Sequence, residues 1–158
     1  MCPEIGGIFG NRVRVRVCGI CWDGNKLLMV NHIGMGPGDF WAPPGGGVEF
    51  GDTVEETLVR EFAEETGLEV IAQRFMCVCE FVRRPLHAVE LFFEVSVKPG
   101  SPMKGTDPEL PADAQIISSV AFMPFEHIQL LDKDQRHGLF EIFKTEKALK
   151  SATGYWKI

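Results

Sequence analysis

Hydrophobic and polar residues alternate near the start of the chain, where residues 12–17 read RVRVRV. A period of two is typical of a half-buried β-strand, so we expect the valines to face the core and the arginines to face solvent. The turn-forming residues 23–25 separate this segment from a second apolar run at residues 26–31. The two runs therefore predict a β-hairpin.

The second half of the chain predicts two long strands, at residues 68–82 and 86–97, joined by a turn at the sequence RRPL. In the later strand, Ala88, Glu90, Phe92 and Glu94 share one face. A Pro/Gly/Asp-rich loop follows at residues 98–115, then a strand at 116–123, a short helix at 124–131 and a C-terminal helix at 133–150 interrupted by Gly138. Mixed strands with a few helices favour an α+β or α/β sandwich, and we expect residues 1–158 to form a single domain.

Between these halves, residues 53–66 have the pattern of an amphipathic helix. We expect Asp52 to cap it, with Glu55 completing a capping box, and Gly67 to end it in a left-handed conformation. Apolar residues recur at Val54, Leu58 and Phe62, which predicts the buried stripe. Spacing of four residues would let Arg60 bridge Glu56 and Glu64.

Negative charge is concentrated around this helix, at Glu49, Asp52, Glu55, Glu56, Glu61, Glu64, Glu65 and Glu69. Most charged helix faces are solvated, but Glu61 and Glu65 project into the same arc as the apolar stripe, with Glu64 at its edge. Three carboxylates beside a buried stripe are costly unless a cation neutralises them. Carboxylates spaced i, i+3, i+4 suit Mg²⁺, or Mn²⁺, rather than zinc.

Three consecutive glycines, residues 45–47, precede the helix. Glycine lets the backbone approach a ligand closely, and the carbonyl groups could join a metal shell. A helix N-terminus also attracts phosphate. Together these features favour a phosphate-rich small-molecule substrate bridged to the protein by metal ions.

Composition excludes several other classes of protein. The net charge of −6 argues against bulk electrostatic binding of nucleic acid. The chain has no apolar run near the roughly 20 residues that span a bilayer, and its first residues do not read as a secretory signal. We therefore expect a soluble, cytoplasmic protein without a membrane partner; a homodimer remains open.

The chain has five cysteines, at positions 2, 18, 21, 77 and 79. Because this number is odd and no export signal is evident, we do not expect a framework of disulfide bonds. The sequences CGIC and CVC could supply a four-thiolate zinc site. Because both lie in β-like apolar runs, we favour buried free thiols.

Residues 46–68 resemble the signature of the Nudix (MutT-like) hydrolases, which is glycine, five residues, glutamate, seven residues, then R-E-apolar-x-E-E-x-G-apolar. The positions here are Gly46, Asp52 and residues 60–68, which read REFAEETGL. The spacing matches throughout, and Asp52 is the one departure, since the family normally has glutamate there. In the family this position supports the loop and helix more than it binds metal, so we expect activity to survive.

The resemblance implies an α/β/α sandwich with a mixed β-sheet and hydrolysis of a pyrophosphate linkage in a nucleoside diphosphate derivative. It implies that Glu61, Glu64 and Glu65 bind the divalent metal, with Gly45 contributing its carbonyl, and that Arg60 orients the acidic side chains. The water's proton would pass to Glu61 or to an acid outside the signature. Glu90, as a metal ligand or base, and Glu109 are candidates, and Glu80 is a weaker one; an exposed edge-strand position for Glu90 is left open.

Substrate contacts are less specific in the sequence. Phe40 and Trp41 could stack a base or serve as core aromatics. Arg83 and Arg84 could bind phosphate or ribose or belong to a solvated turn. The four histidines have no ligand-like spacing, and we assign them no role.

Two rival functions remain. A catalytically attenuated Nudix-fold nucleotide sensor or binding module would lack the glutamates of the signature, which are present here. An isomerase acting on an isoprenoid diphosphate would need a catalytic cysteine and a signature of its own, and neither is evident.

Overall fold

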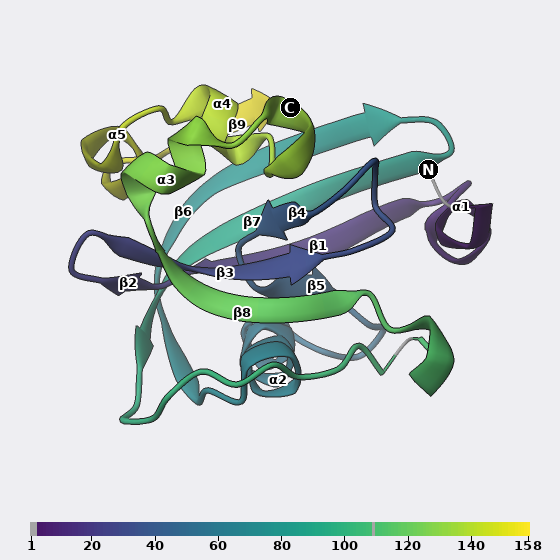
Figure 1. Ribbon diagram of the computed structural model, residues 1–158, viewed down its shortest axis with the longest axis horizontal. Coiled ribbons are helices and arrows are strands. Elements are labelled where there is room, and N and C mark those ends of the chain that lie inside the picture. The colour runs from purple at the N-terminus through teal and green to yellow at the C-terminus, as the bar shows by residue number, and fades with distance from the viewer. Residues whose placement is uncertain (1–2, 109) are drawn as a thin grey trace.

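The computed structural model describes residues 3–108 and 110–158, which form two β-sheets with helices on both sides (Figure 1). The elements in chain order are α1 (Pro3–Phe9), β1 (Val13–Ile20), β2 (Trp22–Asp23), β3 (Lys26–His32), β4 (Phe40–Ala42), β5 (Gly45–Gly47), α2 (Val54–Thr66), β6 (Val70–Arg83), β7 (Leu86–Val97), the 3₁₀ turn η1 (Ala112–Ala114), β8 (Ile117–Pro124), α3 (Phe125–Leu130), the 3₁₀ turn η2 (Lys133–Gln135), α4 (Leu139–Ile142), α5 (Glu146–Lys150) and β9 (Tyr155–Lys157).

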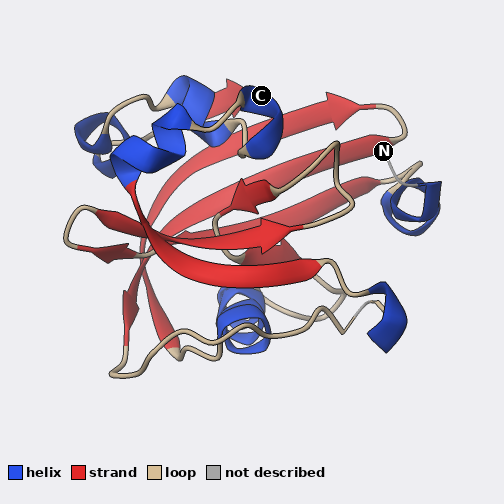
Figure 2. Cartoon of the chain, viewed as in Figure 1, coloured by secondary structure: helices blue, strands red, loops and turns tan. Residues whose placement is uncertain are grey.

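The larger sheet has the strand order β5-β1-β7-β6-β9 and is mixed. Strand β1 is parallel to β7 and antiparallel to β5, whereas β6 is antiparallel to β7 and parallel to β9. The smaller sheet is antiparallel, with β3 pairing with β2, β4 and β8. In the view of Figure 2, α2 lies below the strands and α3, α4 and α5 lie above them, which confirms the expected α/β architecture with a mixed sheet.

Alternate residues of the strands supply two hydrophobic clusters. One cluster joins α2 to the sheets through Val17, Leu28, Leu58, Phe62 and Val95. The other, on the side of α3 and α4, includes Ile20, Leu27, Phe92, Ile128 and Phe140. Gly19 permits close packing of α2, because a Cβ there would lie 2.4 Å from the Phe62 ring.

Two expectations for elements were wrong. The C-terminal segment is not one interrupted helix but η2, α4, α5 and β9, because the chain leaves the helical conformation at Phe143 (φ −102°, ψ 88°). Strand β1 also differs from the prediction: Val17 is buried as expected, but Val13 and Val15 are 59% and 44% exposed, and Arg14 and Arg16 are partly buried instead of facing solvent. The hairpin at Gly24 and the long strands β6 and β7 are as expected.

The four cysteines that the structure describes, Cys18, Cys21, Cys77 and Cys79, are buried and free. This confirms that they behave as apolar strand residues; Cys2 lies outside the described residues. No helix among the described residues combines the length and apolar character that a membrane crossing requires.

Candidate active site

Helix α2 is fixed at both ends by its own residues. Its N-cap is Thr53 rather than Asp52: the Thr53 hydroxyl accepts the Glu56 backbone N–H at 3.2 Å, and Glu56 accepts the Thr53 N–H at 2.8 Å. The predicted capping box is therefore displaced by one residue, because the extended backbone and hydroxyl of Thr53 satisfy the first turn. At the other end Gly67 adopts the predicted left-handed conformation, with φ 70°.

The buried stripe of α2 carries two carboxylates, as the helical spacing predicted. Leu58 and Phe62 are fully buried, and beside them Glu61 and Glu65 are only 9% and 6% exposed. Glu64 lies at the edge, with its side chain 28% exposed. The arrangement thus brings charged groups against the core.

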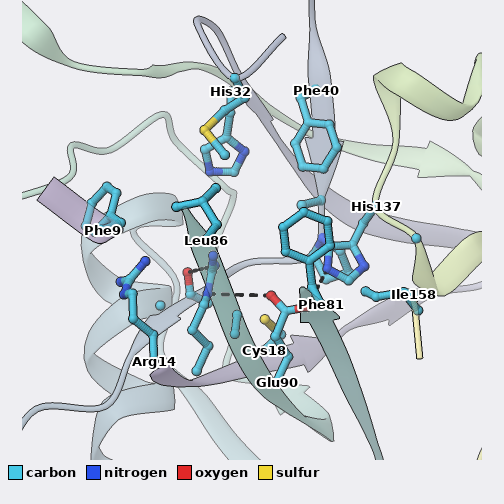
Figure 3. Close-up of a pocket in the computed structure, with 18 of the residues that line it drawn as sticks. Phe9, Arg14, Cys18, His32, Phe40, Phe81, Leu86, Glu90, His137 and Ile158 are labelled. Carbon is cyan, nitrogen blue, oxygen red and sulfur yellow. Dashed lines mark hydrogen bonds and ion pairs between the residues drawn. The ribbon is translucent and has the colours of Figure 1, made fainter. Parts of the chain in front are cut away.

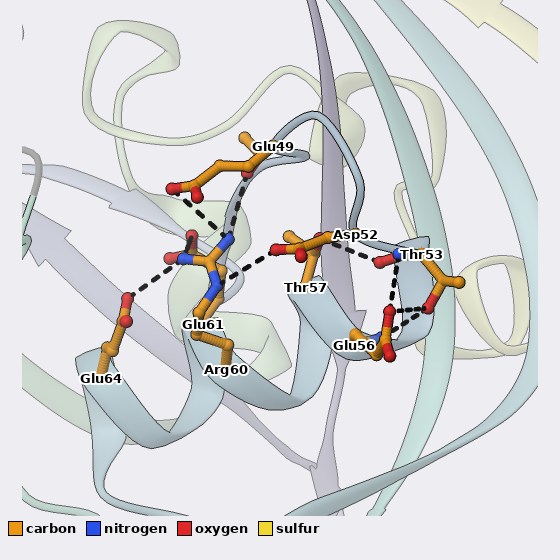
Figure 4. A network of polar contacts seen from close by, with 9 residues as sticks. Glu49, Asp52, Thr53, Glu56, Thr57, Arg60, Glu61 and Glu64 are labelled. Atoms are coloured by element: carbon orange, nitrogen blue, oxygen red, sulfur yellow. Dashed lines mark hydrogen bonds and ion pairs between the residues drawn. The ribbon is translucent and has the colours of Figure 1, made fainter.

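Arg60 connects the acidic groups around α2 (Figure 4). Its guanidinium lies 3.1 Å from Glu61 and 3.5 Å from Glu64, and two further carboxylates, of Glu49 and Asp52, lie at 3.9 Å. The predicted bridge to Glu56 is wrong, because Glu56 is engaged by the N-cap. Asp52, the departure from the signature, reaches Arg60 with its shorter side chain.

The glycine strand β5 packs directly on this helix. Glu65 accepts the Gly45 backbone N–H at 2.9 Å. A Cβ on Gly46 would lie 2.3 Å from the Glu61 carboxyl group, so only glycine leaves room for that side chain as it stands. The glycines therefore set the positions of both buried carboxylates.

The electrostatics of this cluster fit a divalent cation. Burial, followed by the nearby Glu65 carboxylate, raises the pKa of Glu61 to about 8 in spite of Arg60. Burial likewise raises the pKa of Glu64. Hard oxygen ligands whose charged forms are disfavoured are the groups that a divalent cation would stabilise. Within the described residues, no three acidic, imidazole or thiol groups are already gathered as a metal cluster, since Arg60 engages Glu61 and Glu64, and Glu65 accepts the Gly45 N–H.

A cavity of about 520 Å³ opens beside the carboxylates, and Figure 3 shows its walls. Several predicted site residues line it: Phe40, Gly45, Glu61, Glu65, Arg83 and Glu90. Trp41 instead packs against the hydrophobic cluster, and Arg84 is exposed in the β6–β7 turn. The aromatic rings of Phe9 and Phe81 join Phe40 in the lining.

The structure gives the outside acids different surroundings. Glu90 is 4% exposed on β7, an internal strand between β1 and β6, so the edge-strand interpretation is wrong. Glu80 is hydrogen-bonded to His87 at 2.8 Å and accepts a hydrogen bond from the Tyr155 hydroxyl. Glu109 lies outside the described residues.

The charged and imidazole side chains that sequence reasoning missed in the cavity include Arg14, Arg16, His32 and His137. The two arginines line the cavity, and Arg16 pairs with Glu90, its neighbour across β1 and β7. His137 shares a hydrogen bond of 2.7 Å with Glu90, and His32 lies 3.9 Å from Glu65. The alternating arginines were the available signal, but their partner became visible only once the strand register was known.

The mixed sheet, the helices on both sides and the acidic helix beside the cavity define an α/β sandwich with a carboxylate-lined site. A model of the NUDIX domain matches residues 10–143, so the chain belongs to the Nudix hydrolase family. An ADP-ribose pyrophosphatase from Methanocaldococcus jannaschii is 31% identical over 119 residues, covering 74% of this chain and 70% of that protein. Nucleoside triphosphatase NudI from Salmonella heidelberg is 48% identical over 63 residues, covering 38% of this chain and 44% of that protein.

Solved structures agree on the fold. A NUDIX hydrolase from Nitrosomonas europaea has a TM-score of 0.73 at 18% identity, covering 90% of this chain and 93% of that one. A MutT NUDIX hydrolase from Burkholderia pseudomallei has a TM-score of 0.66 at 19% identity, covering 89% and 98%. At these identities the likeness concerns the architecture alone.

Proposed function

We propose that this Nudix hydrolase cleaves a pyrophosphate linkage in a nucleoside diphosphate or triphosphate derivative, using Mg²⁺ or Mn²⁺. The observation that carries the proposal is the pair of buried carboxylates, Glu61 and Glu65, set by β5 at the wall of a cavity of about 520 Å³. That volume lies within the range of sites for small organic ligands. The retained glutamates favour an enzyme over a nucleotide sensor.

The residues that would hold the ion are Glu61, Glu64 and Glu65, together with the carbonyl of Gly45, which also accepts from Arg16 at 3.5 Å. A bound divalent ion would neutralise the diphosphate and lower the pKa of a water molecule. The chain itself orients these groups: Gly45 fixes Glu65 through its N–H, and Arg60 restrains Glu61 and Glu64. Phe40 and Arg83 line the same cavity, and in this proposal they contact the base, ribose or phosphate.

A substrate screen tests the proposal. Purified protein would be incubated with ADP-ribose, nucleoside diphosphate sugars and nucleoside triphosphates, each with Mg²⁺ and with Mn²⁺, and the products separated by chromatography. ADP-ribose is included because it is named in the activity of the archaeal relative. Metal-dependent release of a nucleotide product is the expected result, and no turnover of any compound in the set would reject the proposed reaction.

A further inference from the structure

Three side chains that line the cavity, Arg16, Glu90 and His137, contact one another in series, and none of them belongs to the acidic helix. Arg16 on β1 lies opposite Glu90 on β7, and its Nε is 3.6 Å from Glu90 Oε1. The other oxygen, Oε2, is 2.7 Å from His137 Nε2. Figure 3 shows Glu90 and His137 pointing toward one another within the cavity. Both carboxylate oxygens thus face nitrogen groups of the protein.

The hydrogen bonds of His137 indicate which of its two ring nitrogens carries a hydrogen. Its Nδ1 accepts the Leu139 backbone N–H at 3.1 Å, so this nitrogen carries no hydrogen. The ring proton is therefore on Nε2, which donates it to Glu90. Glu90 thus accepts from His137 on one oxygen and faces the Arg16 guanidinium with the other.

The Arg16 guanidinium is held by the protein through only some of its N–H donors. One terminal nitrogen donates to the Gly45 carbonyl at 3.5 Å, and Nε faces Glu90. Among the described residues these are its polar contacts, and they use at most two of the five N–H groups of a guanidinium. The side chain lines the cavity and is 26% exposed. It therefore presents a fixed cation beside the glycine strand and the acidic helix.

We propose that Arg16 binds a non-bridging phosphate oxygen of the substrate, and that Glu90 and His137 position it rather than bind metal or accept a proton. The inference rests on the proposed function, since it concerns the same cavity. Arginine suits this role because its planar donors match a phosphate group. Glu90 orients those donors, and His137 holds Glu90 in turn.

The test compares the variants Arg16→Lys, Arg16→Met, Glu90→Gln and the neutral double variant Arg16→Met/Glu90→Gln. In Glu90→Gln, His137 would keep its acceptor, but the amide NH₂ would face the Arg16 Nε–H, donor against donor, and turn the guanidinium away. The pair Arg74 and Glu94, which lie 3.5 Å apart outside the cavity lining, provides matched controls as Arg74→Lys and Glu94→Gln. KM, kcat and the Mg²⁺ concentration for half-maximal rate would be measured for each, with thermal unfolding to confirm folding.

Loss of a charged hydrogen bond to phosphate predicts a KM increase of about 10- to 100-fold for Arg16→Met and Glu90→Gln. The values of kcat should change much less, and the Mg²⁺ requirement of Glu90→Gln should be unchanged. The double variant should be no worse than Arg16→Met, because Glu90 acts through Arg16. Arg16→Lys should fall between wild type and Arg16→Met, and the controls should behave as wild type.

A different pattern would overturn the inference. If Glu90→Gln lowers kcat by about 100-fold or more, or raises the Mg²⁺ requirement, and does so equally in the Arg16→Met background, Glu90 is a metal ligand or base. Binding of α,β-methylene-ADP with Mg²⁺, measured by calorimetry, separates this failure from failure of the proposed function. Binding that is weakened in Arg16→Met supports the assignment even if no substrate is turned over, and equal binding by wild type and Arg16→Met refutes it.

Discussion

At the scale of single residues, Glu64 and Glu65 illustrate how an acid can be removed without disturbing its packing. Glutamine is nearly isosteric, and the amide oxygen introduced by Glu65→Gln could still accept the Gly45 N–H. We expect Glu64→Gln and Glu65→Gln to fold normally and to lose turnover by roughly 10²- to 10⁴-fold, the scale for a key metal or acid–base group. Steady-state rates at saturating Mg²⁺ check this, and a near wild-type rate in either variant would contradict the role of that residue.

The raised pKa of Glu61 predicts how the stability of the metal-free protein depends on pH. Burial and Glu65 raise the pKa of Glu61 to about 8 in the folded protein, whereas its ordinary value is 4.5. Between these two pH values the folded protein therefore keeps a proton that the unfolded chain has released. This stabilisation is complete below pH 4.5 and is lost as pH rises toward 8. In EDTA, the Tm difference between wild type and Glu61→Gln should therefore shift against wild type between about pH 5.5 and about pH 8.5. A difference that stays constant, or shifts in favour of wild type, would show that Glu61 titrates normally.

The residue roles differ in how far sequence could predict them. Glu61 and Glu65 follow from helical spacing alone, since about 100° per residue places them beside Leu58 and Phe62. The alternation at Arg14 and Arg16 wrongly placed both arginines in solvent, because alternation separates two faces of a strand but does not show what covers each face. The neighbour across the sheet that pairs with Arg16 is Glu90, which is 74 positions away in the chain.

At the scale of elements, the contact between β5 and α2 depends on two glycines that differ in what surrounds them. A Cβ on Gly45 would lie 2.1 Å from the Val17 backbone oxygen, which cannot move without distorting β1. A Cβ on Gly46 would meet the end of the Glu61 side chain, which can rotate away. The two positions should therefore fail in different ways when alanine is introduced.

We expect Gly45→Ala to destabilise the fold by about 1–3 kcal/mol, the usual range for an overpacked buried site. Gly46→Ala should change the unfolding free energy less but lower activity by about tenfold or more, because it displaces Glu61. Urea unfolding and steady-state kinetics on both proteins separate the effects. Gly51→Ala is an unsuitable control because that glycine has φ 98°, whereas Gly7, whose Cβ would have open space, serves. Equal loss of stability at both positions would disprove the distinction.

Element boundaries were predictable where local chemistry was strong and not elsewhere. Gly67 ends α2 because its left-handed conformation is accessible to glycine, and the acidic first turn marks the beginning to within one residue. Residues 133–150 have a helical pattern interrupted by Gly138, yet this segment folds into several short elements. Its conformation is set by contacts such as the Arg136 hydrogen bond to the Ile128 carbonyl and the pairing of β9 with β6, which local pattern does not encode.

At the scale of the whole molecule, the cavity is assembled from segments that are distant in sequence. The Nudix signature gives one wall, while Phe9, Phe81, His137 and Ile158 come from α1, β6 and the C-terminal region. Phe40 and Arg83 were proposed as substrate contacts from residue type, and the fold brings both to this cavity. Trp41 is directed into the core because adjacent residues of a strand point to opposite sides.

The acidic helix and the cysteines together predict how metal removal affects the molecule. The two hydrophobic clusters consist mostly of aliphatic and aromatic side chains, and the four described cysteines are buried among them. EDTA should therefore abolish hydrolysis without unfolding the protein, and added Mg²⁺ should restore it, because carboxylates hold a labile, oxygen-preferring ion. Circular dichroism, activity and elemental analysis would be measured on the same sample, and no stoichiometric zinc is expected.

About one zinc per chain, with unfolding on its removal, would show that the thiols form a structural site. Turnover that persists in EDTA would instead refute the metal-dependent reaction while leaving the cysteine assignment intact.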